Sequence, residues 1–279
     1  ILTMLKAFVE SRFPFSGELS FSGVIDEEAY SKGARAMMDT DFSACDAIVL
    51  AEPYPGDETK PVPLGITGKI LYEIHVQGRA AHGFRPHLGI NAVEEAARIL
   101  ASLDKLPMRA HPSFGQGNTC TLKIEGGYQV YSVVVPDRCR VEINRLLVPG
   151  ESADTALQDM EELIASLGLR ATTHIALKPP RYEPFVVSHN EPIIRVFHQV
   201  YCQVMGRDPL YAYCGGITDA NVFAGKGIPC LHLGPVRGNV HQPNEYVDLD
   251  GLAPLTTMYA LIAARFLSGV KGAGGTPPQ

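Results

Sequence analysis

The order of strand-like and helix-like segments in the middle of the chain most constrains its fold. The helix-like segment at 89–106 carries an apolar stripe along one face. In the helix-like segment at 152–167, Ser152 marks the start, and Gly168 follows the end. In chain order the segments are a strand at 64–78, a helix at 89–106, strands at 117–127 and 137–148, a helix at 152–167 and a strand at 170–178. This β-α-β-β-α-β order predicts a ferredoxin-like sandwich.

The flanking segments predict an α/β layer that the sandwich interrupts. They are a strand at 17–24, a helix at 27–38, a buried strand at 45–53, a helix at 190–206 that Asn190 is expected to cap, a strand at 228–234 and a helix at 248–267. Strand, helix and strand in succession favour a parallel sheet. We expect an α/β domain split into residues 1–64 and 180–268, an inserted domain at 65–179 and a disordered tail at 269–279.

The first residues read as the middle of a helix. The chain begins without Met, and Leu2, Leu5 and Val9 share one helical face with no capping residue before them. We therefore expect that an N-terminal segment of the natural protein is absent from this sequence.

Charge and composition exclude several classes of protein. The net charge is −6 and no basic run is present, which argues against nucleic acid as a partner. We find no apolar stretch of about 20 residues and no signal peptide, so no membrane association is expected. Six scattered cysteines form no CxxC pair, which favours free thiols in a reducing, cytoplasmic setting.

Three adjacent acids, Asp26, Glu27 and Glu28, lie between a predicted strand and a predicted helix. Ligands of open α/β sheets gather at the carboxyl ends of strands, which would make these acids part of a site. Acids are also favoured at a helix N-terminus, because they interact well with its dipole. Taken alone, the cluster is more typical of a helix start.

Glu52 and His241 shift the interpretation toward a metal site. Glu52 ends the apolar strand at 45–53, where a carboxylate needs a partner or a metal, and His241 lies in a loop before the last helix. Carboxylate oxygen and imidazole nitrogen suit zinc and similar divalent ions. Because adjacent side chains point in different directions, Glu27 and Glu28 could divide the roles of proton acceptor and metal ligand.

Five short motifs together resemble one enzyme family. They are DEE at 26–28, AEP at 51–53, GRAAHGFRPHLGINAV at 78–93, GGITDANVF at 215–223 and HQPNEYVDLDGL at 241–252. Each is weak alone, but their order is specific. From about Leu2 to Leu267 the chain resembles the co-catalytic zinc metallopeptidases and deacylases, such as acetylornithine deacetylase, succinyl-diaminopimelate desuccinylase, aminoacylase and glutamate carboxypeptidase. The resemblance implies a zinc-peptidase-like α/β catalytic domain with an inserted lid domain that forms a homodimer.

The resemblance also implies roles for single residues of the metal site. Glu27 corresponds to the general base, Glu28 to a ligand of one zinc ion and Glu52 to a ligand of the other. His241 would share a metal with Glu28. His82 corresponds to the lid histidine that polarises the scissile carbonyl in the partner subunit's site. Two zinc ions per complete subunit are expected, with Co²⁺ or Mn²⁺ as alternatives.

On the substrate side, Arg145 resembles the lid arginine that holds a substrate carboxylate, and Gly216 and Thr218 resemble a loop lining the substrate pocket. Read without the resemblance, Arg145 is an ordinary strand-end charge and the loop a plain turn. The expected function is hydrolysis of an amide bond next to a free carboxylate, in a small acyl amino acid or a short peptide.

Two departures from the family pattern are visible. The family's first metal motif, His-x-Asp, would precede Ile1, and Val133 stands where the family usually has asparagine. The first departure leaves open a catalytically inactive fragment or a dimerising scaffold, because at most three metal ligands remain. An ordinary binding protein with an acidic pocket is the third alternative.

Overall fold

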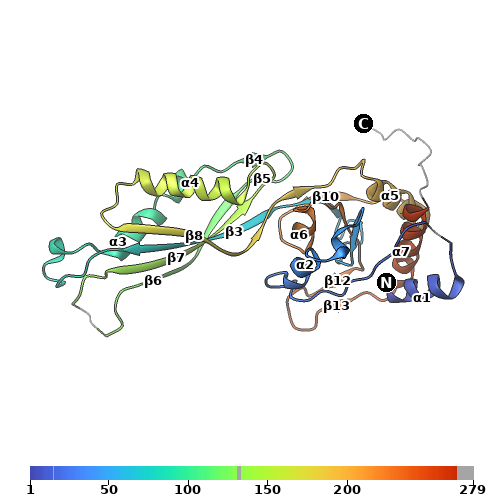
Figure 1. Ribbon diagram of the computed structural model, residues 1–279, viewed down its shortest axis with the longest axis horizontal. Helices are drawn as coiled ribbons and strands as arrows, with labels where there is room; N and C mark the ends of the chain where they lie inside the picture. Colours follow the sequence, from blue (N-terminus) through green and yellow to red (C-terminus); the bar gives the residue numbers. More distant parts are fainter. Residues whose placement is uncertain (15, 131–132, 269–279) are drawn as a thin grey trace. The chain divides into compact units, whose positions relative to one another are not determined.

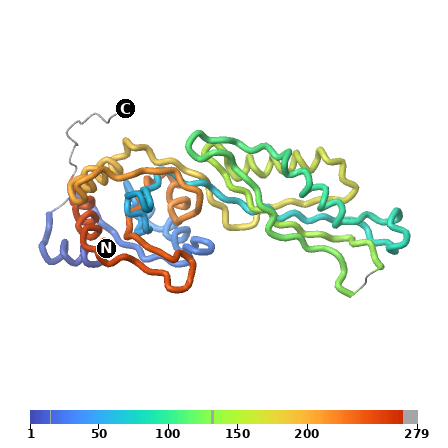
Figure 2. Tube along the Cα trace, turned by 180° about the vertical axis from the view of Figure 1, so that it is seen from behind, coloured from blue at the N-terminus to red at the C-terminus, as the bar shows by residue number. Residues whose placement is uncertain are grey.

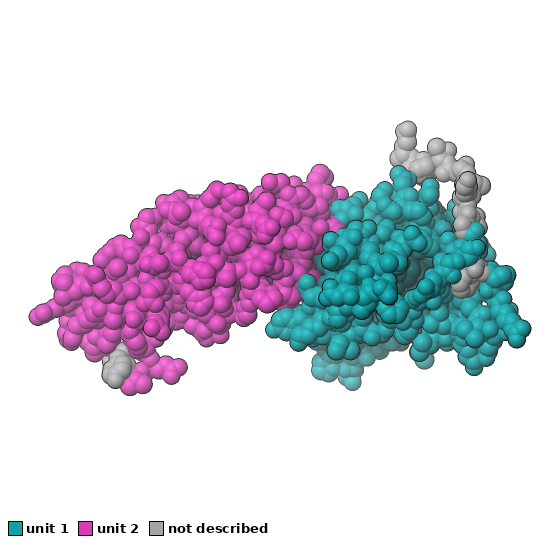
Figure 3. Space-filling view, viewed as in Figure 1, with its two compact units in different colours: residues 1–66, 186–214, 218–279 teal, residues 67–185, 215–217 magenta. Residues whose placement is uncertain are grey.

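The computed structural model describes residues 1–14, 16–130 and 133–268, so the expected tail at 269–279 lies outside the described residues. The chain forms two compact units, shown in different colours in Figure 3. Unit 1 comprises residues 1–66, 186–214 and 218–279, and unit 2 comprises residues 67–185 and 215–217. The main boundaries between the units thus lie at 66/67 and 185/186. The sequence predicts these boundaries at 64/65 and 179/180.

Unit 2 is a four-stranded antiparallel sheet with two helices (Figure 1). Its main elements are β3 (Gly68–Gln77), α3 (Ala92–Leu100), β6 (Asn118–Gly126), β7 (Arg138–Leu147), α4 (Ala153–Ser166) and β8 (Thr172–Tyr182). The strands lie in the order β6-β7-β3-β8. This arrangement confirms the ferredoxin-like prediction, because the order along the chain and the order in the sheet are those of a split βαβ sandwich.

One face of this sheet is covered by both helices. Side chains at every second position of β3 and β7 point to that face, as the two-residue period of a strand requires. They form one core with small and apolar side chains of α3 and α4. Its fully buried members include Ile70, Tyr72, Ile74, Val141, Ile143, Ala96, Ile99, Ala156 and Met160. The Tyr72 hydroxyl is satisfied within this core, donating to the Ala156 carbonyl at 2.7 Å.

The helix expected from residue 89 begins at Ala92, and the helix expected after the Ser152 cap begins at Ala153 as predicted. Asn91 caps α3, its side chain accepting the backbone N–H groups of Val93 and Glu94. Ser152 and Thr155 form a capping box at the start of α4. Shorter elements of the unit are η2 (Pro86–Leu88), η3 (Leu103–Lys105), β4 (Ala110–His111) and β5 (Gly115–Gln116).

Unit 1 contains parallel strand pairs, as an α/β layer should. β1 (Ile48–Leu50) pairs in parallel with β11 (Cys230–His232). β2 (Val62–Ile66) pairs in parallel with β10 (Tyr211–Cys214) and has β9 (Phe185–Val186) on its other side. A small antiparallel hairpin joins β12 (Arg237–Gly238) to β13 (Tyr246–Val247). The mixed α/β prediction is confirmed.

Helices pack around these strands. They are α1 (Leu2–Ser11), α2 (Lys32–Met37), the 3-10 turn η1 (Asp41–Ser43), α5 (Pro192–Met205), α6 (Ala220–Ala224) and α7 (Leu252–Leu267). α7 packs against both α5 and α1, and α1 lies beside it in the views of Figures 1 and 2. Among the described residues, no helix combines the length and apolar character needed to cross a bilayer.

Three local predictions in unit 1 are wrong. Residues 17–24 form no strand, because alternation stabilises a strand only where a neighbour supplies hydrogen bonds, and Phe21 remains 48% exposed. The helix expected from residue 27 starts only at Lys32, after a turn. The N-cap residue of α5 is Glu191, and not Asn190 as predicted. Gly206 ends that helix as expected, with φ of 68°.

Candidate functional site

A tight turn presents the acids at 26–28. The Asp26 carbonyl accepts the backbone N–H groups of Tyr30 and Ser31, at 3.2 and 2.7 Å. The Gly33 N–H donates to the Ile25 carbonyl at 3.0 Å, and a Cβ at position 33 would lie 2.4 Å from the Ile25 nitrogen. Only glycine fits this close approach. The turn therefore depends on contacts between residues four to eight positions apart along the chain.

Glu52 lies just beyond the carboxyl end of β1, partly buried. The neighbouring parallel strand β11 continues into Gly234, and a Cβ there would lie 2.3 Å from the Glu52 carbonyl oxygen. The two segments of the chain can pass this closely because residue 234 is a glycine, which has no side chain. The carboxylate thus stands at the edge of the sheet where open α/β folds bind ligands.

His241 lies in the loop of the β12–β13 hairpin. Its backbone has φ of 58°, and Asn239 and Asn244 of the same loop are also left-handed. The Gln242 N–H donates to the Asn239 carbonyl at 3.0 Å, and the Asn239 side-chain amide donates to the Asn244 carbonyl at 3.2 Å. These internal hydrogen bonds give the loop a defined shape that presents the imidazole.

The fold brings His241 and Glu28 together. The His241 Nε2 lies 3.2 Å from the Glu28 Oε2, and the two side chains are 67% and 72% exposed. An exposed pair of this kind contributes little to folding stability. An imidazole nitrogen and a carboxylate oxygen at this separation can instead bind one divalent ion between them.

The neighbouring carboxylates disturb one another's ionisation. Burial, together with the charges of Glu52, Asp219 and Glu28, raises the pKa of Glu27 to about 7, while Arg237 opposes the rise. Burial also raises the pKa of Glu52, against the lowering effect of Arg237 and Lys60. The carboxylates therefore form one cluster of concentrated negative charge, and a divalent cation would relieve this repulsion. The residues present fit a bound metal.

Asp219 belongs to this cluster but was missed from the sequence. It is the residue directly before α6, is 3% exposed, and receives a hydrogen bond from the Ser31 side chain. Its Oδ1 has no hydrogen-bond partner among the described residues. Burial raises its pKa from the ordinary value. The aspartate stands inside the GGITDANVF motif, so an acid directly before a helix at a strand end was the available signal.

The two residues expected to line a substrate pocket differ in accessibility. Gly216 is exposed, has φ of 145°, and exchanges two hydrogen bonds with Thr67 Oγ1 at 3.1 and 3.2 Å. Thr218 is 7% exposed, and its hydroxyl lies 2.9 Å from Nε2 of the buried His232. Thr218 also accepts the Ala220 N–H, at 3.2 Å. These contacts give Thr218 the role of bracing the loop from within.

Arg145 is a core residue of unit 2. Its side chain is 1% exposed and lies 2.7 Å from Glu151, whose side chain is 2% exposed. The Nη2 that makes this contact also donates to Asp159 at 3.2 Å and to the Pro107 carbonyl at 2.9 Å, and Nη1 donates to the Tyr72 hydroxyl at 3.1 Å. A guanidinium so enclosed has a structural role, so we leave Arg145 out of the substrate site expected for it.

His82 of unit 2 is exposed at a loop. Its Nδ1 accepts the Phe84 N–H at 3.2 Å, and its backbone bridges to Val134. Because Nδ1 acts as acceptor, the neutral ring carries its proton on Nε2. Val133 stands where the family usually has asparagine. Its backbone carbonyl accepts the N–H of Gly83, in the loop of His82, at 2.8 Å.

Comparison with known proteins identifies the family. The profile described as Peptidase family M20/M25/M40 matches residues 1–265. The chain belongs to this family. The match confirms the expected kinship with metal-dependent hydrolases, and it covers both units.

Curated relatives from bacteria share this kinship. The chain is 24% identical over 279 residues to the succinyl-diaminopimelate desuccinylase of Legionella pneumophila (strain Lens), with 96% of this chain and 71% of that protein covered. It is 28% identical over 206 residues to the enzyme of the same name from Xylella fastidiosa (strain 9a5c), with 74% of this chain covered. It spans 53% of the length of the Xylella protein.

Solved structures share the fold. The aminopeptidase PepT from Bacillus cereus superposes with a TM-score of 0.75 at 21% identity, over 94% of this chain and 68% of that one. A dinuclear metal binding peptidase of the M20 family from Bacillus subtilis superposes with a TM-score of 0.70 at 16% identity, over 96% of this chain and 70% of that one. The catalytic-domain and inserted-domain architecture expected for the family is thus confirmed as a fold.

Proposed function

We propose that this protein hydrolyses an amide bond next to a free carboxylate, in an N-acyl amino acid or a short peptide. The observation that carries the proposal is the 3.2 Å approach of His241 to Glu28, whose charge also acts on the preceding Glu27, in a chain of the M20/M25/M40 family. The kinship favours a hydrolase over a dimerising scaffold without activity.

Glu28, His241 and Glu52 are the residues we propose to hold metal. Their oxygen and nitrogen donors suit Zn²⁺, with Co²⁺ or Mn²⁺ as alternatives, and two ions per complete subunit follow the family pattern. Bound metal would act as a Lewis acid and make a water molecule nucleophilic at neutral pH. Glu28 and Glu52 come from separate segments, and the charge of Glu28 acts on Glu52, so the fold sets the spacing of these ligands.

Glu27 is proposed as the general base. It precedes Glu28 in the turn, and adjacent side chains leave a turn in different directions, so Glu27 is free to face the attacking water. Its carboxylate would accept the water proton and return it to the leaving amine nitrogen. Groups of this kind contribute about 10²- to 10⁴-fold to a rate. The cation beside it would favour its ionised form at neutral pH.

His82 is proposed to stabilise the oxyanion. The Phe84 N–H occupies its Nδ1, which leaves an exposed Nε2–H as a donor toward a negatively charged oxygen. The family resemblance has this histidine act in the partner subunit's site, so we propose a homodimer formed through the lid, unit 2. Exposure of the ring is consistent with a role outside its own unit.

A hydrolysis panel tests the proposal. The protein, expressed from its complete coding sequence and loaded with Zn²⁺ or Co²⁺, should release amine from at least one class among N-acetyl amino acids, N-succinyl amino acids and dipeptides. Glu27→Gln should lower turnover by about 10²- to 10⁴-fold while the protein still binds metal. Glu10→Gln, an exposed acid on α1, is the matched control and should leave turnover unchanged.

Two outcomes would contradict the proposal. Wild-type turnover in Glu27→Gln would remove the assigned base. Metal binding without hydrolysis of any panel member would favour a binding protein with an acidic pocket.

A further inference from the structure

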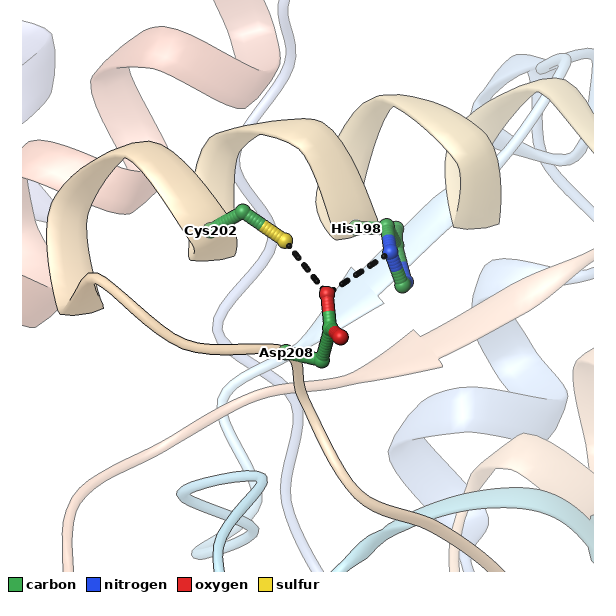
Figure 4. A group of neighbouring side chains, drawn as sticks. All are labelled: His198, Cys202 and Asp208. Atoms are coloured by element: carbon green, nitrogen blue, oxygen red, sulfur yellow. Dashed lines mark hydrogen bonds and ion pairs between the residues drawn. The ribbon is translucent and has the colours of Figure 1, made fainter. Parts of the chain in front are cut away.

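A second group of metal-ligand side chains lies in unit 1 at the end of α5, apart from the carboxylate cluster. His198 and Cys202 are four residues apart on the helix, so they share one face. Gly206 ends the helix in a left-handed conformation and turns the chain, after which Asp208 meets that face (Figure 4). All three side chains point toward one another in Figure 4.

The separations of these atoms suit a tetrahedral ion. Asp208 Oδ1 lies 3.1 Å from Cys202 Sγ and 3.4 Å from His198 Nε2. An ion about 2.3 Å from sulfur and about 2.0 Å from nitrogen and oxygen requires edges of roughly 3.5 and 3.3 Å. All ligand atoms of the group lie within 4.8 Å of one another. Small side-chain adjustments would therefore complete the geometry.

Tyr211 supplies the support that ligating histidines usually have. Its hydroxyl lies 3.3 Å from His198 Nδ1, and the two rings stack with an interplanar angle of 11°. When Nδ1–H donates to this hydroxyl, Nε2 is left as the unprotonated acceptor that a metal needs. Tyr211 lies on β10, so the ring is oriented by a strand of the sheet.

We propose that His198 Nε2, Cys202 Sγ and Asp208 Oδ1 bind a Zn²⁺-like divalent cation, with a fourth position open to water. The thiolate and imidazole favour Zn²⁺ and Co²⁺ over Mg²⁺ and Ca²⁺, which prefer oxygen ligands. On binding, the S–H bond breaks, a metal–sulfur bond forms from the sulfur electron pair, and the proton passes to solvent. The ion would tie the loop after α5 to the helix.

The protein holds the same atoms together without a cation. Burial, together with the hydrogen bond to Asp208 and its charge, raises the pKa of Cys202 to about 11. The thiol therefore donates to the carboxylate in the ion-free state. The alternative to a metal site is this hydrogen-bonded arrangement alone, and an experiment can separate the two.

The decisive probe is Co²⁺ alone, titrated into the metal-free protein. A thiolate bound to Co²⁺ gives a near-ultraviolet charge-transfer band, and the proposed catalytic ligands include no thiol, so the band reports this site. We expect the band in the wild type, in His241→Ala and in the control Cys120→Ser, whose thiol is exposed in unit 2. We expect no band in Cys202→Ser.

Substitution of His198, Asp208 or Tyr211 should lower the affinity of the site for Co²⁺. His198→Gln and Asp208→Asn each remove a ligand and should weaken Co²⁺ binding at least tenfold. Tyr211→Phe keeps the ring but removes the partner of His198 Nδ1, and should weaken binding by about 10- to 100-fold. Unchanged affinity in all three variants would contradict the proposed ligand set.

An absent band in the wild type, or an unchanged band in Cys202→Ser, would overturn the proposal. Circular dichroism checks that each variant is folded. If Cys202→Ser does not fold, alkylation of the wild type provides the test. Zn²⁺ should slow alkylation of Cys202 but not of Cys120, as measured by peptide mass spectrometry, and equal rates with and without Zn²⁺ would also overturn the proposal.

Discussion

The His241 Nε2 lies 3.2 Å from the Glu28 Oε2, although the two residues come from opposite ends of the chain. One sits in the turn before α2 and the other in the β12–β13 hairpin loop, and each segment is shaped by its own backbone hydrogen bonds. Exposed ion pairs seldom repay the entropy of holding two side chains together. We propose that a metal ion bound by both side chains accounts for this approach.

Removing either side chain should remove metal. We expect His241→Ala and Glu28→Gln each to lower the metal content of the dialysed protein by at least one equivalent, because a site with too few ligands cannot hold its ion. Elemental analysis by mass spectrometry measures the content. His87→Ala, an exposed histidine of unit 2, is the control. Equal metal content in the wild type and both site variants would refute the shared-ligand assignment.

Gly33→Ala should disturb the site without touching a ligand. The new Cβ would lie 2.4 Å from the Ile25 nitrogen and 2.8 Å from its carbonyl oxygen, so the turn that carries Glu27 and Glu28 must shift. We expect metal affinity to fall at least tenfold, as measured by competition with a chelator. Gly23→Ala is the matched control, since the nearest atom to its Cβ is 4.0 Å away. If the two variants behave alike, the turn does not position the acids.

Arg145→Met should destabilise unit 2. It leaves the buried Glu151 carboxylate without its guanidinium partner, and breaking a buried pair in this way costs about 3–5 kcal/mol. Denaturant unfolding measures the change, and the double variant Arg145→Met/Glu151→Met should recover much of it. Arg140→Met is the control: its side chain is 34% exposed, and the change should stay within about 1 kcal/mol.

The opposite result for Arg145 would be equally informative. Unchanged stability together with a raised KM for carboxylate-bearing substrates would restore the substrate contact that the sequence suggested.

His232 should make the protein sensitive to acid. Burial lowers its pKa to about 3 from an ordinary value of 6.5, so the folded state keeps it neutral while the unfolded chain takes up a proton. Its share of stability is complete above pH 6.5 and is lost as the pH falls toward 3. The loss is at most about 1.4 kcal/mol per pH unit.

Unfolding in denaturant at pH 7.5 and 5 measures this difference. We expect His232→Gln, which keeps a polar atom facing Thr218, to lose less stability on acidification than the wild type does. The exposed His87→Gln should follow the wild type. A wild-type slope in His232→Gln would show that other groups govern the acid response.

Local periodicity decided much of this protein. The order of strand-like and helix-like segments, the Ser152 cap and the Gly168 stop are all local signals, and they sufficed to predict the ferredoxin-like unit and its place within an α/β layer. Such signals act over a few residues, so they can be read without knowing what lies opposite. The ordered motifs likewise pointed to the family before any geometry was known.

Tertiary structure decided which of the marked residues meet. The alternation at 17–24 forms no strand without a neighbour, Arg145 is enclosed in a core instead of facing a ligand, and Asp219 joins the carboxylate cluster through the packing of α6. The approach of Glu28 to His241 and of Asp208 to Cys202 also required the folded chain. The physical reason is common to all of them: burial, pairing and shared charge depend on what packs opposite a residue, and one-dimensional spacing does not contain that information.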